Sequence, residues 1–108
     1  MEWSERQTAT ALVGEPRGRV DENSWEAFLA AISAALVTAQ AANLPMVLSL
    51  ANIDYMSSRG LRVLTLAKRD ADTRGVAIML AKPNHRMKEI LAISRYDKIF
   101  TVTEQLEA

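Results

Sequence analysis

The sequence predicts an α/β fold built on a small mixed, mostly parallel sheet of four to five strands. Apolar runs at residues 46–50 and 76–80 have the length and flanking residues of buried strands. They alternate with segments in which apolar residues recur at helical spacing, so the expected order is strands, helix, strand, helix, strand, helix, strand. Strand–helix–strand units place their strands parallel and join them by right-handed crossovers. With 108 residues and no repeat or linker, we expect one domain over residues 1–108.

The N-terminal region is expected to hold a first strand that is then interrupted. Residues 8–13 mix Thr, Ala, Leu and Val, a composition that suits a strand. Gly14, Pro16 and Gly18 follow closely and predict a bend, a bulge or a short hairpin before residues 19–20.

The first helix has the clearest pattern. Asn23 is the expected N-cap, with Glu26 three residues later as in a capping box, and Ser24 is the alternative cap. Asn43 can adopt the left-handed conformation that ends a helix, and Pro45 prevents its continuation. The apolar residues that repeat at helical spacing are Trp25, Phe28, Leu29, Ile32, Ala35, Leu36 and Ala39, and we expect them to face the core.

Two strand–helix pairs follow. The strand at residues 46–50 is apolar except for Ser49, which indicates a strand covered by helices on at least one side. The second helix starts after two adjacent serines and runs to about Thr73, where Gly75 stops it. The strand at residues 76–80 comes next.

The last part of the chain predicts a third helix and an edge strand. Asn84 is the expected cap of the third helix, which carries Met87, Ile90 and Leu91 on one face. Residues 99–102 predict a last edge strand, and residues 103–104 the start of a short terminal helix.

Composition argues against several classes of function. Thirteen basic and thirteen acidic residues give a formal net charge of zero, and the basic residues are scattered, so we expect no nucleic-acid partner. The absence of cysteine excludes disulfides and thiolate chemistry. Because His85 is the one histidine, a metal site built on several imidazoles is not expected, and neither is a cofactor.

We expect neither export nor direct membrane insertion. The N-terminal residues, Met-Glu-Trp-Ser-Glu-Arg, lack the basic and apolar regions of a signal peptide. The least polar stretch, residues 27–42, is mostly alanine with serine, threonine and glutamine, and is short for a membrane span. The sequence therefore predicts a soluble, cytoplasmic protein.

Ser57 and Ser58 lie between the strand at residues 46–50 and the second helix, followed by Arg59 and Gly60. A serine there can cap the helix, because its oxygen accepts a hydrogen bond from an otherwise unpaired backbone N–H. The same place suits an added phosphate, because free N–H groups and the positive end of the helix dipole converge there. Spacing alone leaves both roles open.

A phosphate at this position would act as a switch. It would add nearly two negative charges and be tolerated at a helix N-terminus, but not by a partner surface pressed against that turn. Arg59, Arg62 and Arg69 are either solvated or in contact with an acidic partner. Tyr55 and Met56, beside the serines, are either partner-facing or buried.

An enzymatic function has weaker support in the sequence than a binding function, and we expect that the protein is not an enzyme. Asp54 or Asp21 could join Ser58 and His85 in a hydrolase-like triad, but the Gly-x-Ser-x-Gly pattern of a nucleophile elbow is absent. A phosphate-cradling loop needs several glycines, and this turn has only Gly60, so Walker-type hydrolysis is not supported. Weak nucleotide binding at the helix start stays open.

Residues 57–61, Ser-Ser-Arg-Gly-Leu, and residues 18–21, Gly-Arg-Val-Asp, are two motifs that together resemble those of the STAS domain family, the anti-sigma factor antagonists. The first motif is similar to the family's Ser-Ser-Ala-Gly-Leu, with arginine at the small-residue position. The second motif is similar to its Gly-Arg-Leu-Asp, which precedes the first helix. The resemblance covers nearly the whole chain and implies a small mixed sheet with helices packed mainly on one face.

The resemblance also implies a non-enzymatic role in bacterial partner switching. The unphosphorylated protein would bind an anti-sigma factor that is also a serine kinase, be released when that kinase phosphorylates it, and be reset by a serine phosphatase. The family's phosphorylated serine falls on Ser58, with Ser57 as the alternative, and its nearby acidic residue falls on Asp21. Together with the residues beside the serines, the expected partner-binding set is Asp21, Tyr55, Met56, Ser57, Arg59 and Arg62.

A second reading of the same resemblance is a cytoplasmic subunit of a lipid or anion transport system, or a stress-signalling scaffold. Such a subunit would purify together with the ATPase subunit of a membrane transporter.

Overall fold

The computed structural model describes residues 1–104, which form three helices and a mixed sheet of six strands. In chain order the elements are β1 (Glu2–Gln7), β2 (Leu12–Val20), α1 (Trp25–Ala42), β3 (Met46–Ser49), β4 (Asn52–Met56), α2 (Ser58–Arg74), β5 (Ile78–Ala81), α3 (His85–Ser94), the 3-10 helix η1 (Tyr96–Lys98) and β6 (Val102–Thr103). The predicted α/β class and the mostly parallel sheet are confirmed, but the sheet has six strands rather than four to five.

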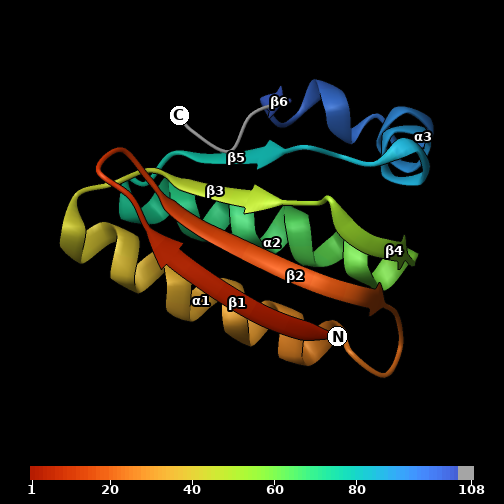
Figure 1. Ribbon diagram of the computed structural model, residues 1–108, viewed down its shortest axis with the longest axis horizontal. Helices are drawn as coiled ribbons and strands as arrows, with labels where there is room; N and C mark the ends of the chain where they lie inside the picture. The colour runs from red at the N-terminus through yellow and green to blue at the C-terminus, as the bar shows by residue number, and fades with distance from the viewer. Residues whose placement is uncertain (105–108) are drawn as a thin grey trace.

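The sheet is organised around β2, the longest strand (Figure 1). Its first half, Leu12–Gly14, pairs with β3, and its second half, Arg17–Val20, pairs with β4, both in parallel. On its other edge β2 pairs with β1, and this is the one antiparallel pair among the described strands. β3 and β4 therefore follow one another along the same edge of β2. β5 and β6 extend the sheet beyond β3.

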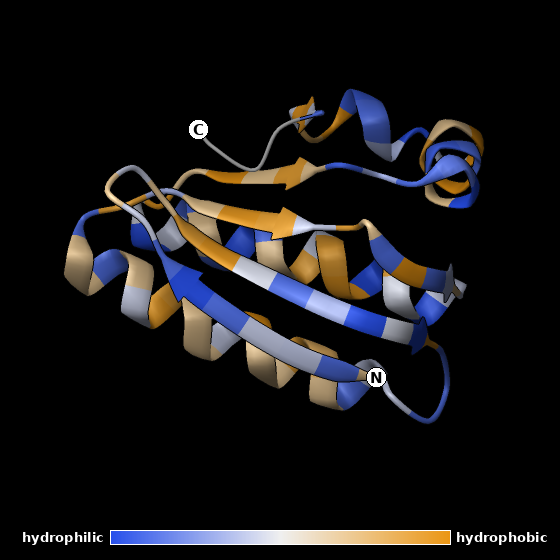
Figure 2. Cartoon of the chain, in the orientation of Figure 1, coloured by the Kyte–Doolittle hydropathy of each residue, from blue (hydrophilic) through white to orange (hydrophobic). Residues whose placement is uncertain are grey.

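α1 and α2 lie side by side on one face of the sheet, and α3 lies beside β4 (Figure 1). Alternate strand residues point into the core beneath α1 and α2. Figure 2 shows β3 and β5 as predominantly hydrophobic, as strands of a sheet interior are. The prediction that the helices pack mainly on one face of the sheet is therefore confirmed. The core residues that join the sheet to α1 and α2 include Leu12, Val20, Met46, Leu48, Leu80, Phe28, Ile32, Leu36, Val63, Leu64 and Ala67.

Hydrophobic patterning missed β1 because most of its side chains are polar and exposed (Figure 2). The expected strand at residues 8–13 is instead a turn followed by the start of β2, with Thr8 Oγ1 accepting from the backbone N–H of Ala11 at 3.0 Å. Pro16 is tolerated inside β2 because it lies between the two paired halves, where no parallel ladder bond is required. The predicted bulge occurs between Gly18 and Arg19, where Gly18 has a φ of +103°.

Sequence reasoning also missed β4, which was expected to be part of the turn before the second helix. β3 ends at Ser49, and the chain bends into β4, whose Ile53 is buried while Asp54 is exposed. The bend is held by Asn84, whose amide nitrogen donates to the carbonyl of Ile53 at 2.7 Å. The Asn84 Oδ1 accepts from the backbone N–H of Met87 at 2.9 Å, which confirms the predicted cap of α3.

The other helix ends agree in part with the predictions. Ser24 rather than Asn23 precedes α1, and its hydroxyl donates to the carbonyl of Arg19 at 2.8 Å instead of capping the helix. Asn43 and Gly75 end α1 and α2 in the left-handed conformation, as expected. Residues 102–103 form the edge strand β6, so the strand predicted at residues 99–102 begins three residues later than expected. The terminal helix predicted to start at residues 103–104 does not start there, because Thr103 pairs in β6, and the rest of that prediction lies outside the described residues.

Among the residues that the structure describes, α1 is the one helix long and apolar enough to cross a membrane by length and composition, with a mean hydropathy of 1.3. This is weak support for a membrane span, because core helices meet the same criteria. The buried residues of α1 belong to the core that it shares with the sheet.

Replacing Asn84 by Asp should destabilise the fold by about 1–3 kcal/mol. Aspartate keeps the cap of α3, but it loses the donated hydrogen bonds and sets a carboxylate against carbonyl oxygens. Urea unfolding measures the difference, with the exposed Asn23→Asp as a control that should stay close to wild type. Equal stability of Asn84→Asp and wild type would show that the amide is not needed at the bend.

Candidate functional site

The site lies where β2 and β4 end side by side. Val20 pairs with Met56 at the last position of the two parallel strands, and the backbone N–H of Ser57 donates to the carbonyl of Val20 at 2.8 Å. Carboxyl ends of parallel strands meet at one edge of a sheet, where binding sites of α/β proteins commonly form. The segments that follow β2 and β4, starting at Asp21 and Ser57, are thereby brought together.

Gly60 allows α2 to start this close to the strand ends. A Cβ atom at this position would lie 2.5 Å from Met56 Cγ and 2.8 Å from Val20 Cγ1, both shorter than real Cβ contacts. Both neighbours are buried core side chains, so they cannot move aside freely. The glycine of the serine motif is therefore a packing requirement.

Ser57 and Ser58 have different environments. Ser57 is the N-cap of α2, and its hydroxyl oxygen accepts from the backbone N–H of Gly60 at 3.4 Å. Ser58 is the first helical residue and is exposed, and its hydroxyl bonds to none of the residues in the described part of the chain. The capping role thus belongs to Ser57, and the free hydroxyl belongs to Ser58.

Asp21 is held in place by its own loop. Its carboxylate accepts from the backbone N–H of Asn23 at 3.0 Å, and this bond is the main reason why its pKa lies below the ordinary value. Ser24 Oγ at 3.3 Å and Arg19 Nε at 3.6 Å lower the pKa further, while desolvation opposes them. Asp21 is therefore a fixed carboxylate at the edge of the site.

Arginine side chains connect the start of α2 to its neighbours. Arg59 Nε lies 3.0 Å from Glu22 Oε2, and the guanidinium of Arg59 lies 5.5 Å from the ring centroid of Trp25. Each contact is exposed and of modest strength alone, but together they hold Arg59 toward the start of α1. Arg19 lies in the same way over Tyr55, at 4.8 Å.

The structure corrects the expectation for one residue of the predicted partner-binding set. Met56 is 2% exposed and belongs to the hydrophobic core, so it is buried rather than partner-facing. Tyr55 is partly buried under Arg19. The remaining members, including Arg59 and Arg62, lie at the surface around the serines or at its edge.

A hollow of about 510 Å³ opens beside Ser58, between α1 and α2. It has an apolar floor and two guanidinium groups at its rim, and it is lined by Trp25, Ser58, Arg59, Arg62, Val63 and Leu66. The sequence pattern placed Trp25 among the core-facing residues of α1 and gave Glu22 no role, and neither spacing nor composition locates these two residues against the serine motif. We call this hollow the serine groove.

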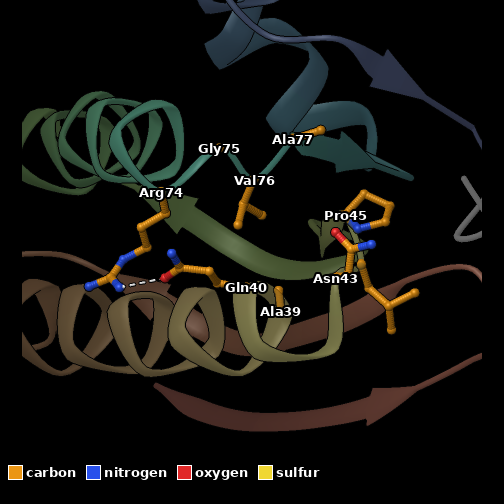
Figure 3. A pocket seen from close by; sticks show the side chains of 9 residues that line it. Ala39, Gln40, Asn43, Pro45, Arg74, Gly75, Val76 and Ala77 are labelled. Carbon is orange, nitrogen blue, oxygen red and sulfur yellow. Dashed lines mark hydrogen bonds between the residues drawn. The ribbon is translucent and has the colours of Figure 1, made fainter.

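A second hollow of about 510 Å³ lies at the opposite ends of α1 and α2 (Figure 3). There Arg74 Nη1 donates to Gln40 Oε1 at 3.0 Å and so bridges the two helices. Arg74 Nε also pairs with Asp70 at 2.9 Å, so the arginine of this hollow is already engaged with two partners.

The hydrolase-like triad is not assembled in the described part of the chain. His85 is 91% exposed, and its Nε2 lies 2.8 Å from Glu89 on α3. Asp21 bonds within its own loop, and Asp54 lines a different surface hollow together with His85. None of these groups is hydrogen-bonded to Ser58.

Comparison of the fold with solved structures places the chain in a defined structural class. A candidate anti-sigma factor antagonist from Thermotoga maritima superposes with a TM-score of 0.83 at 15% identity, covering 96% of this chain and 87% of that one. An anti-sigma factor antagonist from Mycobacterium paratuberculosis gives 0.83 at 16% identity, covering 97% and 86%. Unphosphorylated SpoIIAA, an anti-sigma factor antagonist, gives 0.72 at 16% identity, covering 94% and 87%.

These similarities establish a shared fold. The sequence itself matches the profile of the STAS domain over residues 3–108. The chain therefore belongs to the STAS domain family, as its two motifs indicated.

Replacing Gly60 by Ala should destabilise the protein by about 1–3 kcal/mol, because the new methyl group overlaps Met56 and Val20. In an unhindered helix the same change would stabilise by about 1 kcal/mol, so the sign is diagnostic. Thermal unfolding checks it, with Thr73→Ala at an exposed position of α2 as the control. A Gly60→Ala protein more stable than wild type would contradict the close packing.

Proposed function

We propose that this STAS protein is an anti-sigma factor antagonist, a binding module without catalytic activity of its own. Its partner would be a cytoplasmic anti-sigma factor that is also a serine kinase. The proposal is supported by the fold shared with anti-sigma factor antagonists, among them SpoIIAA, which has been solved in unphosphorylated and phosphorylated forms. The phosphorylated form superposes on this chain with a TM-score of 0.65 at 16% identity.

The proposed site of phosphorylation is Ser58. The observation that supports it is the exposed, unbonded hydroxyl of Ser58 on the first turn of α2. The first turn contains no acidic residue, so the unpaired N–H groups and the helix dipole favour an anion there. Phosphorylating Ser57 instead would cost the cap of the helix. Ser58 is therefore the better acceptor.

In the phosphorylation step, Ser58 Oγ forms a bond to the γ-phosphorus of ATP held by the kinase. The bond from that phosphorus to the ADP oxygen breaks, and the hydroxyl proton passes to a base of the kinase. The product carries about two additional negative charges at the centre of the proposed partner surface. A serine phosphatase would restore the hydroxyl.

The fold should survive this modification while the complex does not. At the helix start the phosphate can be solvated, but a partner covering Asp21, Ser57 and Arg59 would have to desolvate it. Because loss of binding then needs no unfolding, the same molecule can be released and used again.

Affinity capture from lysate of the native host, with wild type and Ser58→Asp as paired baits, tests the proposal. Wild type should retain a kinase-like ATPase, and Ser58→Asp should bind it at least about tenfold more weakly, because the carboxylate must be desolvated in the complex. Incubating the retained kinase with ATP should phosphorylate wild type and Ser57→Ala but not Ser58→Ala.

Ser57→Ala is the matched control, because it removes the neighbouring hydroxyl and leaves the proposed acceptor. Phosphate incorporated into Ser58→Ala but not into Ser57→Ala would move the site to Ser57. Equal retention of one set of transporter subunits by wild type and Ser58→Asp would contradict partner switching and favour the transport subunit.

A further inference from the structure

We infer that Arg62 is the intramolecular ligand of a phosphoryl group on Ser58, so that the serine groove is a built-in phosphate-binding site. The inference rests on the proposed phosphorylation of Ser58 and assigns the contact that the phosphate makes once it is attached.

Ser58 and Arg62 are spaced to meet. They stand four residues apart on α2, and side chains at this spacing are neighbours on one face of a helix, with Cβ atoms about 5–6 Å apart. Both line the serine groove. A phosphate extending from Ser58 Oγ therefore lies within reach of the Arg62 guanidinium, which can hold two phosphate oxygens at once.

Arg62 is also free to make this contact. It is exposed, and none of the ion pairs or side-chain hydrogen bonds within residues 1–104 involves it. Arg59 is the neighbouring alternative, but it would have to leave both Glu22 and the ring of Trp25 to turn toward the phosphate. The geometry therefore favours Arg62 over Arg59, although Arg59 is closer to Ser58 in sequence.

The local charges make a phosphate at this position depend on a cation. Asp21 and Glu22 follow β2 at the same edge of the sheet, and their carboxylates repel it. Arg19 and Arg59 are already paired with these two carboxylates. Arg62 is the guanidinium of the serine groove that these pairs leave uncompensated.

The contact changes what a partner meets. Without phosphate, Arg62 is a free cation on the rim of an apolar hollow and suits an acidic group of the partner. With phosphate, its charge is neutralised within the chain. Phosphorylation would thus remove an attractive group from the surface as well as add a repulsive one.

Protein carrying phosphoserine at position 58, introduced during translation, tests the inference without any kinase. The second pKa of the phosphate is followed by ³¹P NMR in four backgrounds: wild type, R62Q, R59Q and R69Q. Arg69 is exposed on the same helix, about three turns beyond Ser58, and serves as the matched control. An arginine contact favours the dianion, so R62Q should raise the phosphate pKa by roughly half a pKa unit, and R59Q and R69Q by clearly less.

An R62Q protein whose phosphate titrates as in wild type, or an R59Q effect as large as that of R62Q, would overturn the inference. A ¹H–¹⁵N spectrum of each unmodified variant shows whether its fold is intact. Because the phosphoserine is encoded, this result is independent of whether a host kinase modifies Ser58. Failure of the kinase experiment and failure of the arginine contact are therefore distinguishable.

Discussion

The structure depends on the way β2 serves two parallel strands in succession. Its first half pairs with β3 and its second half with β4, so the chain after β4 begins α2 directly beside the end of β2. The hydrogen bond from Ser57 N–H to the Val20 carbonyl closes this junction, and Gly60 allows the helix to pack against it. Without this arrangement the two serines would not lie close to Asp21.

At this junction the two adjacent serine hydroxyl groups have different environments. A cap needs its oxygen turned inward to a backbone N–H of the first turn, and Ser57 supplies it. A modified residue needs its oxygen turned outward, and Ser58 at the first helical position meets that condition. Ser57 thus takes the capping role and leaves Ser58 available for the modification that we propose, so the helix can keep its cap in both states of the proposed switch.

How far the sequence alone could lead is clear from particular elements. The first helix, the strands around Val47 and Leu80 and the caps at Asn43, Gly75 and Asn84 were predictable, because local spacing and turn chemistry determine them. β1 was not, because a polar edge strand forms through pairing with a distant segment rather than through its own hydrophobicity.

The candidate site, like the fold, was predictable only where local sequence determines it. Ser58, Asp21 and Gly60 could be singled out by motif, but the burial of Met56 and the contacts of Arg59 with Glu22 and Trp25 arise from tertiary packing. The serine groove is formed by helices that are adjacent only in the folded chain, so no local pattern reveals it.

Native-state amide hydrogen exchange over residues 57–61 tests the central claim most directly. The account predicts slow exchange at Ser57 and Leu61, whose N–H groups donate at 2.8 Å and 2.9 Å, and fast exchange at Ser58 and Arg59, which open the helix. Fast exchange at Ser57, or protection of Ser58 equal to that of Leu61, would contradict the proposed junction between β2 and α2.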